Sequence, residues 1–127
     1  MAEQHDRSDI LAGVDLSGTD DEVASVLMDL ARTETRPRSD MLASALIVEM
    51  EASGGPMNRR PRRKAAFSVL KSADIPSVLI EIGFLSDDRD LANLRDPVWR
   101  GVMVEALAAG ILRWRDEDLA TQPLVRQ

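Results

Sequence analysis

The sequence predicts an α/β fold in which a helical hairpin precedes a short, open and mostly parallel sheet flanked by helices. Apolar residues recur at helical spacing in the first part of the chain and in short continuous runs in the second. The length of 127 residues suits one small domain. The composition is 44% apolar and 30% charged, which is typical of a globular chain. With only two Phe, two Trp and no Tyr, aliphatic side chains must form most of the core.

A boundary rich in Gly and Pro divides the chain into residues 1–55 and 56–127. Its sequence, GGPMNRRPRRK, contains two glycines and two prolines, which prevent a continuous helix. The net charge changes at the same place. Residues 1–55 hold 12 acidic and 4 basic side chains (−8), residues 56–75 hold 1 and 6 (+5), and residues 76–127 hold 9 and 6 (−3).

The first segment predicts two helices joined by a turn. Thr19 and Glu22 form a capping box that starts a helix at about residues 20–33. Pro37 is expected to end this helix, and Ser39 or Asp40 can cap a second one that runs to Gly54. Apolar residues form a stripe on each helix: Val23, Val26, Leu27, Leu30 and Ala31 on the first, and Leu42, Ala45, Leu46 and Met50 on the second.

The second segment predicts two strands, because its apolar runs at residues 66–70 and 78–84 are too short for amphipathic helices. The longer run carries one charge, Glu81, between Ile80 and Ile82. Such a run is typical of a strand covered on both faces inside a parallel sheet. A buried carboxylate there has two interpretations: a general base whose pKa is raised by desolvation, or one half of a buried ion pair with an Arg.

A C-terminal helix completes the predicted fold. Asp96 is suited to cap it and Pro97 to occupy its first turn. Apolar residues then follow at helical spacing: Trp99, Val102, Met103, Ala106, Gly110, Ile111 and Trp114. This helix is expected to pack on the sheet.

Composition and charge exclude several classes of function. The chain has no Cys, so it can form neither a disulfide framework nor a thiolate nucleophile. Its longest apolar run, residues 106–112, is far shorter than the roughly 20 residues that span a bilayer, and its polar, acidic start is unlike an export signal. The cations Arg59, Arg60, Arg62, Arg63 and Lys64 suggest nucleic-acid binding, but the net charge of −6, the lack of interleaved aromatics and the prolines favour a solvated loop. Attraction of this loop to an anionic wall polymer, or to the acidic N-terminal helices, is the lesser alternative.

The stretch AFSVLKSADIPSVLIEIGFLSDDRDLANLRDPVWRGVMVEALAAGI resembles the C-terminal end of the zinc-dependent N-acetylmuramoyl-L-alanine amidases. The stretch SDILAGVDLSGTDDEVASVLMDLARTETRPRSDMLASALI is similar to the regulatory helical region of their autoinhibited, cell-division branch. The resemblance implies that residues 1–55 are a helical regulatory segment and residues 56–127 the C-terminal part of the catalytic domain. It also implies hydrolysis of the amide between N-acetylmuramic acid and L-alanine in peptidoglycan.

Glu81 matches the family's catalytic glutamate, which takes a proton from a zinc-bound water. The family's zinc ligands lie upstream of the regulatory helices, so we expect this chain to be a partial amidase that holds no zinc by itself. His5 is the single histidine; it and Glu3 lie near the place from which a side chain can cap the zinc in the autoinhibited branch. Asp87 stands where the family usually has Asn.

The resemblance further implies a periplasmic full-length protein whose helical region is released by a LytM-type activator. The alternative is a non-catalytic interaction module in which the apolar stripes of the hairpin dock a partner helix. Packing of those stripes on each other or on the sheet is the favoured interpretation.

Overall fold

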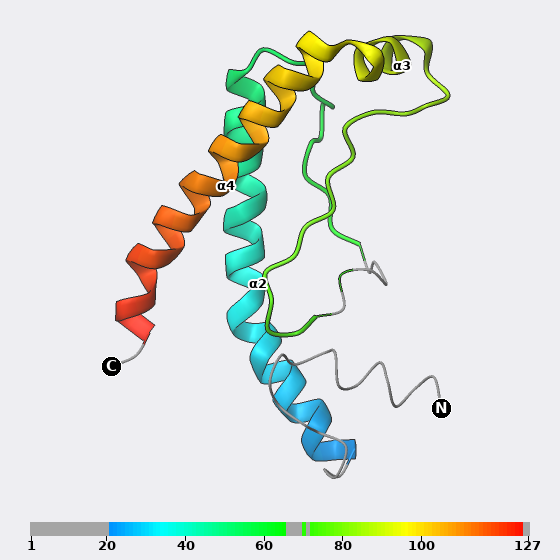
Figure 1. The fold of residues 1–127 in the computed structure, drawn as a ribbon. Helices are drawn as coiled ribbons and strands as arrows, with labels where there is room; N and C mark the ends of the chain where they lie inside the picture. Colours follow the sequence, from blue (N-terminus) through cyan, green and yellow to red (C-terminus); the bar gives the residue numbers. More distant parts are fainter. Residues whose placement is uncertain (1–20, 66–69, 71, 126–127) are drawn as a thin grey trace. The chain divides into compact units, whose positions relative to one another are not determined.

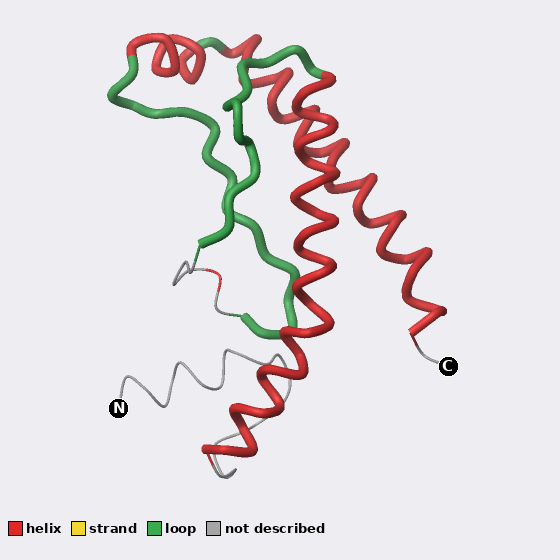
Figure 2. The backbone as a smooth tube through the Cα atoms, turned by 180° about the vertical axis from the view of Figure 1, so that it is seen from behind, coloured by secondary structure: helices red, strands yellow, loops and turns green. Residues whose placement is uncertain are grey.

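The computed structural model describes residues 21–65, 70 and 72–125. These residues form three helices, α2 (Asp21–Ala52), α3 (Asp88–Arg95) and α4 (Pro97–Val125), shown in Figure 1. The described part of the chain contains no strand, and most of the described residues between α2 and α3 form loop (Figure 2). None of the three helices is long and apolar enough to cross a membrane.

The predicted α/β sheet is therefore wrong for the described residues. Residues 76–84 are extended but form no ladder with another described segment, and most of the other predicted strand, residues 66–70, lies outside the described residues. A strand needs a neighbour that satisfies its backbone N–H and C=O groups. The apolar pattern predicts the surroundings of the side chains, but it does not show that such a neighbour exists.

The predicted hairpin is also wrong, because α2 continues through Pro37. Proline removes one backbone hydrogen bond and clashes with the preceding turn, at a typical cost of about 3 kcal/mol. Just before Pro37, the hydroxyls of Thr33 and Thr35 donate to the carbonyls of Asp29 and Ala31, at 2.9 and 2.8 Å. Such bonds to the preceding turn are compatible with a helix that bends without ending.

Two helix ends follow their sequence signals. Gly54 has a φ of 75°, and its N–H donates to the carbonyl of Glu51 at 3.1 Å, so a left-handed glycine ends α2. Asp96 caps α4 as predicted: its carboxylate accepts the N–H of Val98 at 2.9 Å, and Pro97 is the first helical residue.

The described residues divide into two compact units. The first contains residues up to 40 together with residues from 65 to 78. In it, Ala24 and Ala73 are buried, with Met28 and Ala31 packed against them. The N–H of Ser77 donates to the Ser39 hydroxyl at 3.0 Å. The core of this unit is thus small and formed largely by alanine.

The second unit contains residues 41–64 and those from 79 onward, and in it α2 crosses α4 closely. A Cβ atom added at Gly110 would lie 2.8 Å from the Cα of Leu46. Beside this crossing, Arg113 bonds to Glu49 on α2 and to Glu117 on α4, each at 3.1 Å. The hydrogen bond with Glu49, followed by that with Glu117, raises the pKa of Arg113.

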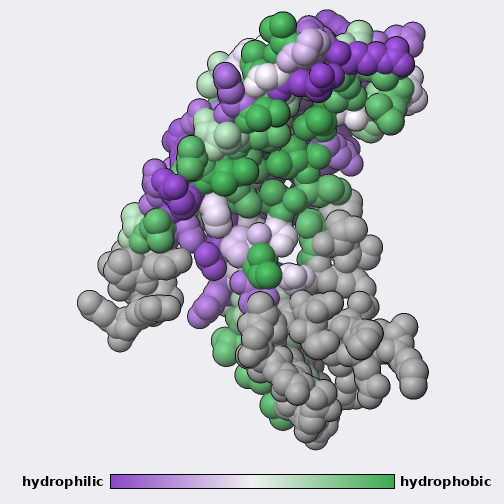
Figure 3. Space-filling view, in the orientation of Figure 1, coloured by the Kyte–Doolittle hydropathy of each residue, from purple (hydrophilic) through white to green (hydrophobic). Residues whose placement is uncertain are grey.

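Many large apolar side chains remain exposed in the described structure, and hydrophobic residues gather on the face drawn in Figure 3. No large side chain is fully buried among the described residues. The exposed group includes Leu79, Ile82, Phe84 and Leu85, which come from the predicted strand and the turn after it.

Candidate functional site

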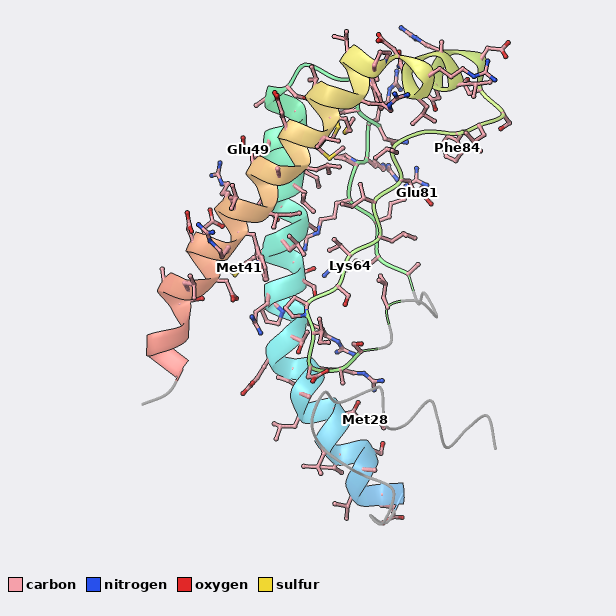
Figure 4. The ribbon with its side chains drawn as sticks, viewed as in Figure 1. Met28, Met41, Glu49, Lys64, Glu81 and Phe84 are labelled. Carbon is pink, nitrogen blue, oxygen red and sulfur yellow. The ribbon has the colours of Figure 1, made fainter. Side chains whose placement is uncertain are left out.

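Glu81 lies on the extended segment that leads into α3 (Figure 4). Its side chain is exposed, and it forms no hydrogen bond or ion pair with the described residues. Its neighbours Ile80 and Ile82 are 38% and 42% exposed. The predicted burial of Glu81 is therefore wrong, and its carboxylate has no arginine partner among the described residues. The catalytic role of Glu81 stays a prediction.

The segment after Glu81 is held at the start of α3 by Asp90. The carboxylate of Asp90 accepts the N–H of Phe84 at 2.9 Å. Gly83 lets the two segments approach, since a Cβ atom added there would lie 3.2 Å from the Cβ of Asp90. Asp90 thus fixes the backbone three residues after Glu81. The sequence interpretation missed Asp90. An acidic residue in the first turn of a helix can accept nearby backbone N–H groups, and this could have indicated its role.

Asp87 is the N-cap of α3. Its carboxylate accepts the N–H groups of Arg89 and Asp90, both at 3.0 Å, and its own N–H donates to the carbonyl of Phe84 at 3.1 Å. Asp and Asn are about equally good at this position, because either side-chain oxygen accepts the free amides of the first turn. This explains physically how Asp87 can stand where the resembling family usually has Asn.

The described residues do not fit a zinc site. Residues 21–65, 70 and 72–125 contain no group of three His, Asp or Glu side chains placed to hold a metal ion. Glu3 and His5, the residues near the place from which a side chain could cap the zinc, lie outside the described residues.

A hollow of about 620 Å³ lies between the end of α2 and the two C-terminal helices, but it does not contain Glu81. Trp99 forms part of its wall, and the buried indole nitrogen of this residue has no hydrogen-bond partner. The hollow is therefore separate from the candidate catalytic carboxylate.

The basic stretch forms an exposed loop after α2, as predicted. Asn58 shapes its start by accepting the backbone N–H of Arg60 at 2.9 Å. Arg62 donates to the hydroxyl of Ser44 on α2 at 3.2 Å. The side chains of Arg59, Arg60 and Arg63 form no hydrogen bond or ion pair within the described part of the chain.

Comparison with known proteins identifies relatives over most of the chain. The model of the N-acetylmuramoyl-L-alanine amidase family matches residues 13–113. N-acetylmuramoyl-L-alanine amidase AmiA of Salmonella typhimurium is 32% identical over 123 residues, which cover 94% of this chain and 42% of the relative.

Two further relatives show how far the similarity extends. AmiC of Escherichia coli O6:H1 is 28% identical over 111 residues, covering 87% of this chain and 26% of the relative. The probable cell wall amidase LytH of Staphylococcus epidermidis is 31% identical over 58 residues, covering 46% of this chain and 20% of the relative. This chain thus spans less than half the length of these relatives. No solved structure matches it.

Proposed function

Because the chain belongs to the N-acetylmuramoyl-L-alanine amidase family, we propose that it forms part of a peptidoglycan hydrolase. The bond cleaved is the amide between the lactyl group of N-acetylmuramic acid and L-alanine. The family match over residues 13–113 is the observation that carries this proposal, since it includes Glu81 and the segment around it.

Glu81 is the proposed general base. Its carboxylate takes a proton from the water that attacks the amide carbon and passes this proton to the departing nitrogen. The C–N bond then breaks to leave an acid on the sugar and an amine on L-alanine. Two features support this role. Glu81 is the single acidic residue between Asp74 and Asp87, and one hydrogen bond to Asp90 holds the backbone that follows it.

Zinc in the complete enzyme is proposed from the family resemblance alone. When bound, such a metal polarises the carbonyl and activates water. The described residues themselves do not fit a zinc site.

Regulation is proposed for α2, which lies in the region similar to the autoinhibitory helices. In this proposal α2 limits access to the catalytic segment until a LytM-type activator binds it, in the periplasm and during cell division. The exposed side chains of Val23, Val26 and Leu30 support a docking role. Deletion of residues 20–54 from the full product of the gene should raise basal hydrolysis. A folded deletion variant with unchanged activity would exclude autoinhibition by α2.

The products of digestion test the proposed activity. Purified peptidoglycan sacculi are incubated with the full product of the gene that encodes these residues, and the released fragments are analysed by mass spectrometry. Amidase activity predicts intact stem peptides with a free amino-terminal L-alanine. Release of glycan fragments, or of peptides cut at another bond, would contradict the assignment.

The alternative function is a non-catalytic helical interaction module. The exposed apolar residues of α2 favour it, because such residues on one helix suit a partner helix or groove. The same digestion separates the two candidates, since a module would release no fragments while still binding a protein partner.

A further inference from the structure

The loop between α2 and the extended segment carries an unbalanced positive charge in an otherwise acidic chain. No Asp or Glu occurs from Ala52 to Ala73, whereas the chain as a whole has a net charge of −6. Residues 59–64 are all exposed. Local acidic residues in the sequence therefore do not neutralise this loop.

The five cations of the loop divide into two groups. Arg62 and Lys64 have partners within the protein, and Arg62 donates to Ser44 on α2 at 3.2 Å. This bond holds the end of the loop against its own unit. The guanidinium groups of Arg59, Arg60 and Arg63 have no partner among the described residues, so their donors point to solvent. Arg62 and Lys64 thus anchor the loop, and the other three arginines are available for a ligand.

We propose that Arg59, Arg60 and Arg63 bind the carboxylates of peptidoglycan stem peptides. This inference rests on the proposed function and names a substrate-binding surface beyond Glu81. A guanidinium presents paired N–H donors in a plane that matches a carboxylate, and three of them within five residues allow multivalent binding to a polymer with repeated carboxylates.

Two physical arguments favour this ligand over nucleic acid. Residues 53–65 contain no aromatic side chain, so the loop has no platform on which bases could stack. The net charge of −6 also opposes long-range attraction of a dense polyanion.

The test measures binding of the full gene product to purified sacculi by co-sedimentation. All proteins carry Glu81→Gln, so that hydrolysis does not release them from the substrate. The test variant combines Arg59→Gln, Arg60→Gln and Arg63→Gln. A matched control combines Arg36→Gln, Arg89→Gln and Arg95→Gln, which removes the same charge from exposed arginines elsewhere. Circular dichroism confirms that both variants keep the helical content of the parent.

The loop variant should bind sacculi at least about fivefold more weakly than the parent, and the control within about twofold of it. Converting the stem-peptide carboxylates of the sacculi to amides should weaken the parent to the same extent as the loop substitutions. Equal binding by the loop and control variants would overturn the proposal. A parallel measurement of binding to single-stranded DNA tests the other ligand. If the loop variant lost binding to this DNA but not to sacculi, the loop would be assigned to nucleic acid and the proposal would be overturned.

Failure of this proposal is distinguishable from failure of the proposed activity. Fragment release by the protein with Glu81 intact reports the activity, whereas co-sedimentation of the Glu81→Gln proteins reports the loop. If the enzyme released stem peptides but bound sacculi independently of Arg59, Arg60 and Arg63, the proposed role of the loop would be wrong. The amidase assignment would still hold.

Discussion

Asp87 and Asp90 together fix the backbone that follows Glu81. Asp87 caps α3, and Asp90 extends from the first turn of α3 to the N–H of Phe84. The candidate base thus lies three residues from a hydrogen-bonded anchor, although its own side chain is free. The backbone that follows Glu81 is therefore held in place, while the exposed carboxylate of Glu81 forms no hydrogen bond or ion pair with the described residues.

The cap at Asp87 gives a prediction about stability. Asp87→Ala removes the acceptor of two backbone amides and should lower the free energy of unfolding by about 1 kcal/mol. Asp87→Asn keeps an acceptor oxygen and should stay within about 0.5 kcal/mol of the parent. Urea unfolding followed by circular dichroism measures both. An equal loss in the two variants would mean that charge, and not the cap, is what matters at this position.

Single residues with local signals were the most predictable from sequence. The pair Asp96 and Pro97 was identified as the start of a helix, and its geometry is confirmed because a cap depends only on neighbouring amides. The prediction that Glu81 is buried was wrong, because burial depends on segments that are distant in sequence. The anchor at Asp90 was missed for a similar reason, since its bond spans six residues and requires a turn.

At the scale of elements, the crossing of α2 and α4 depends on Gly110. Gly110→Ala places a methyl group 2.8 Å from the Leu46 backbone, which must then move. This overpacking should cost about 1–3 kcal/mol of unfolding free energy.

Gly101, also in α4, is the matched control for this substitution. A Cβ atom at Gly101 would meet nothing within 4 Å, so Gly101→Ala should stabilise the helix by roughly 0.5–1 kcal/mol. Opposite signs in the two variants, measured by urea unfolding, support the crossing. Stabilisation by both would show that α2 and α4 do not meet at Gly110.

Pro37 separates the continuous α2 from the helical hairpin that the sequence predicts. In a continuous helix, Pro37→Ala restores a backbone hydrogen bond and should stabilise the protein by up to about 3 kcal/mol. In a hairpin turn, the same change would increase the conformational entropy of the unfolded chain and destabilise the protein by about 0.4–1 kcal/mol. The sign of the shift in unfolding free energy therefore decides between the two structures.

At the scale of the whole molecule, the error in fold class has an identifiable origin. The run at residues 78–84 has the composition of a buried strand, yet Leu79 is 49% and Phe84 62% exposed. Sequence pattern identifies residues that favour burial, whereas a sheet also needs neighbouring strands, and the described residues supply none. The helical parts were more predictable because their backbone bonds are local.

The described residues contain no cluster of side chains that could hold a metal ion, and this leads to a prediction for the 127-residue chain. After dialysis against buffer without metal, it should retain far less than one zinc per molecule, as measured by atomic absorption. Stoichiometric zinc that survives dialysis would contradict this expectation. It would direct attention to His5 and Glu3, which His5→Ala and Glu3→Gln would then test.

The most direct test of the account is the hydrolysis of sacculi by Glu81→Gln in the full product of the gene. The substitution keeps the volume of the side chain but removes the proton acceptor, so release of stem peptides should fall by roughly 100-fold or more. The melting temperature should stay near that of the parent, because Glu81 is exposed and has no partner among the described residues. Glu105→Gln, an exposed site on α4, serves as the matched control and should leave turnover unchanged. Parental turnover with Glu81→Gln would contradict the assignment of Glu81 as the catalytic base.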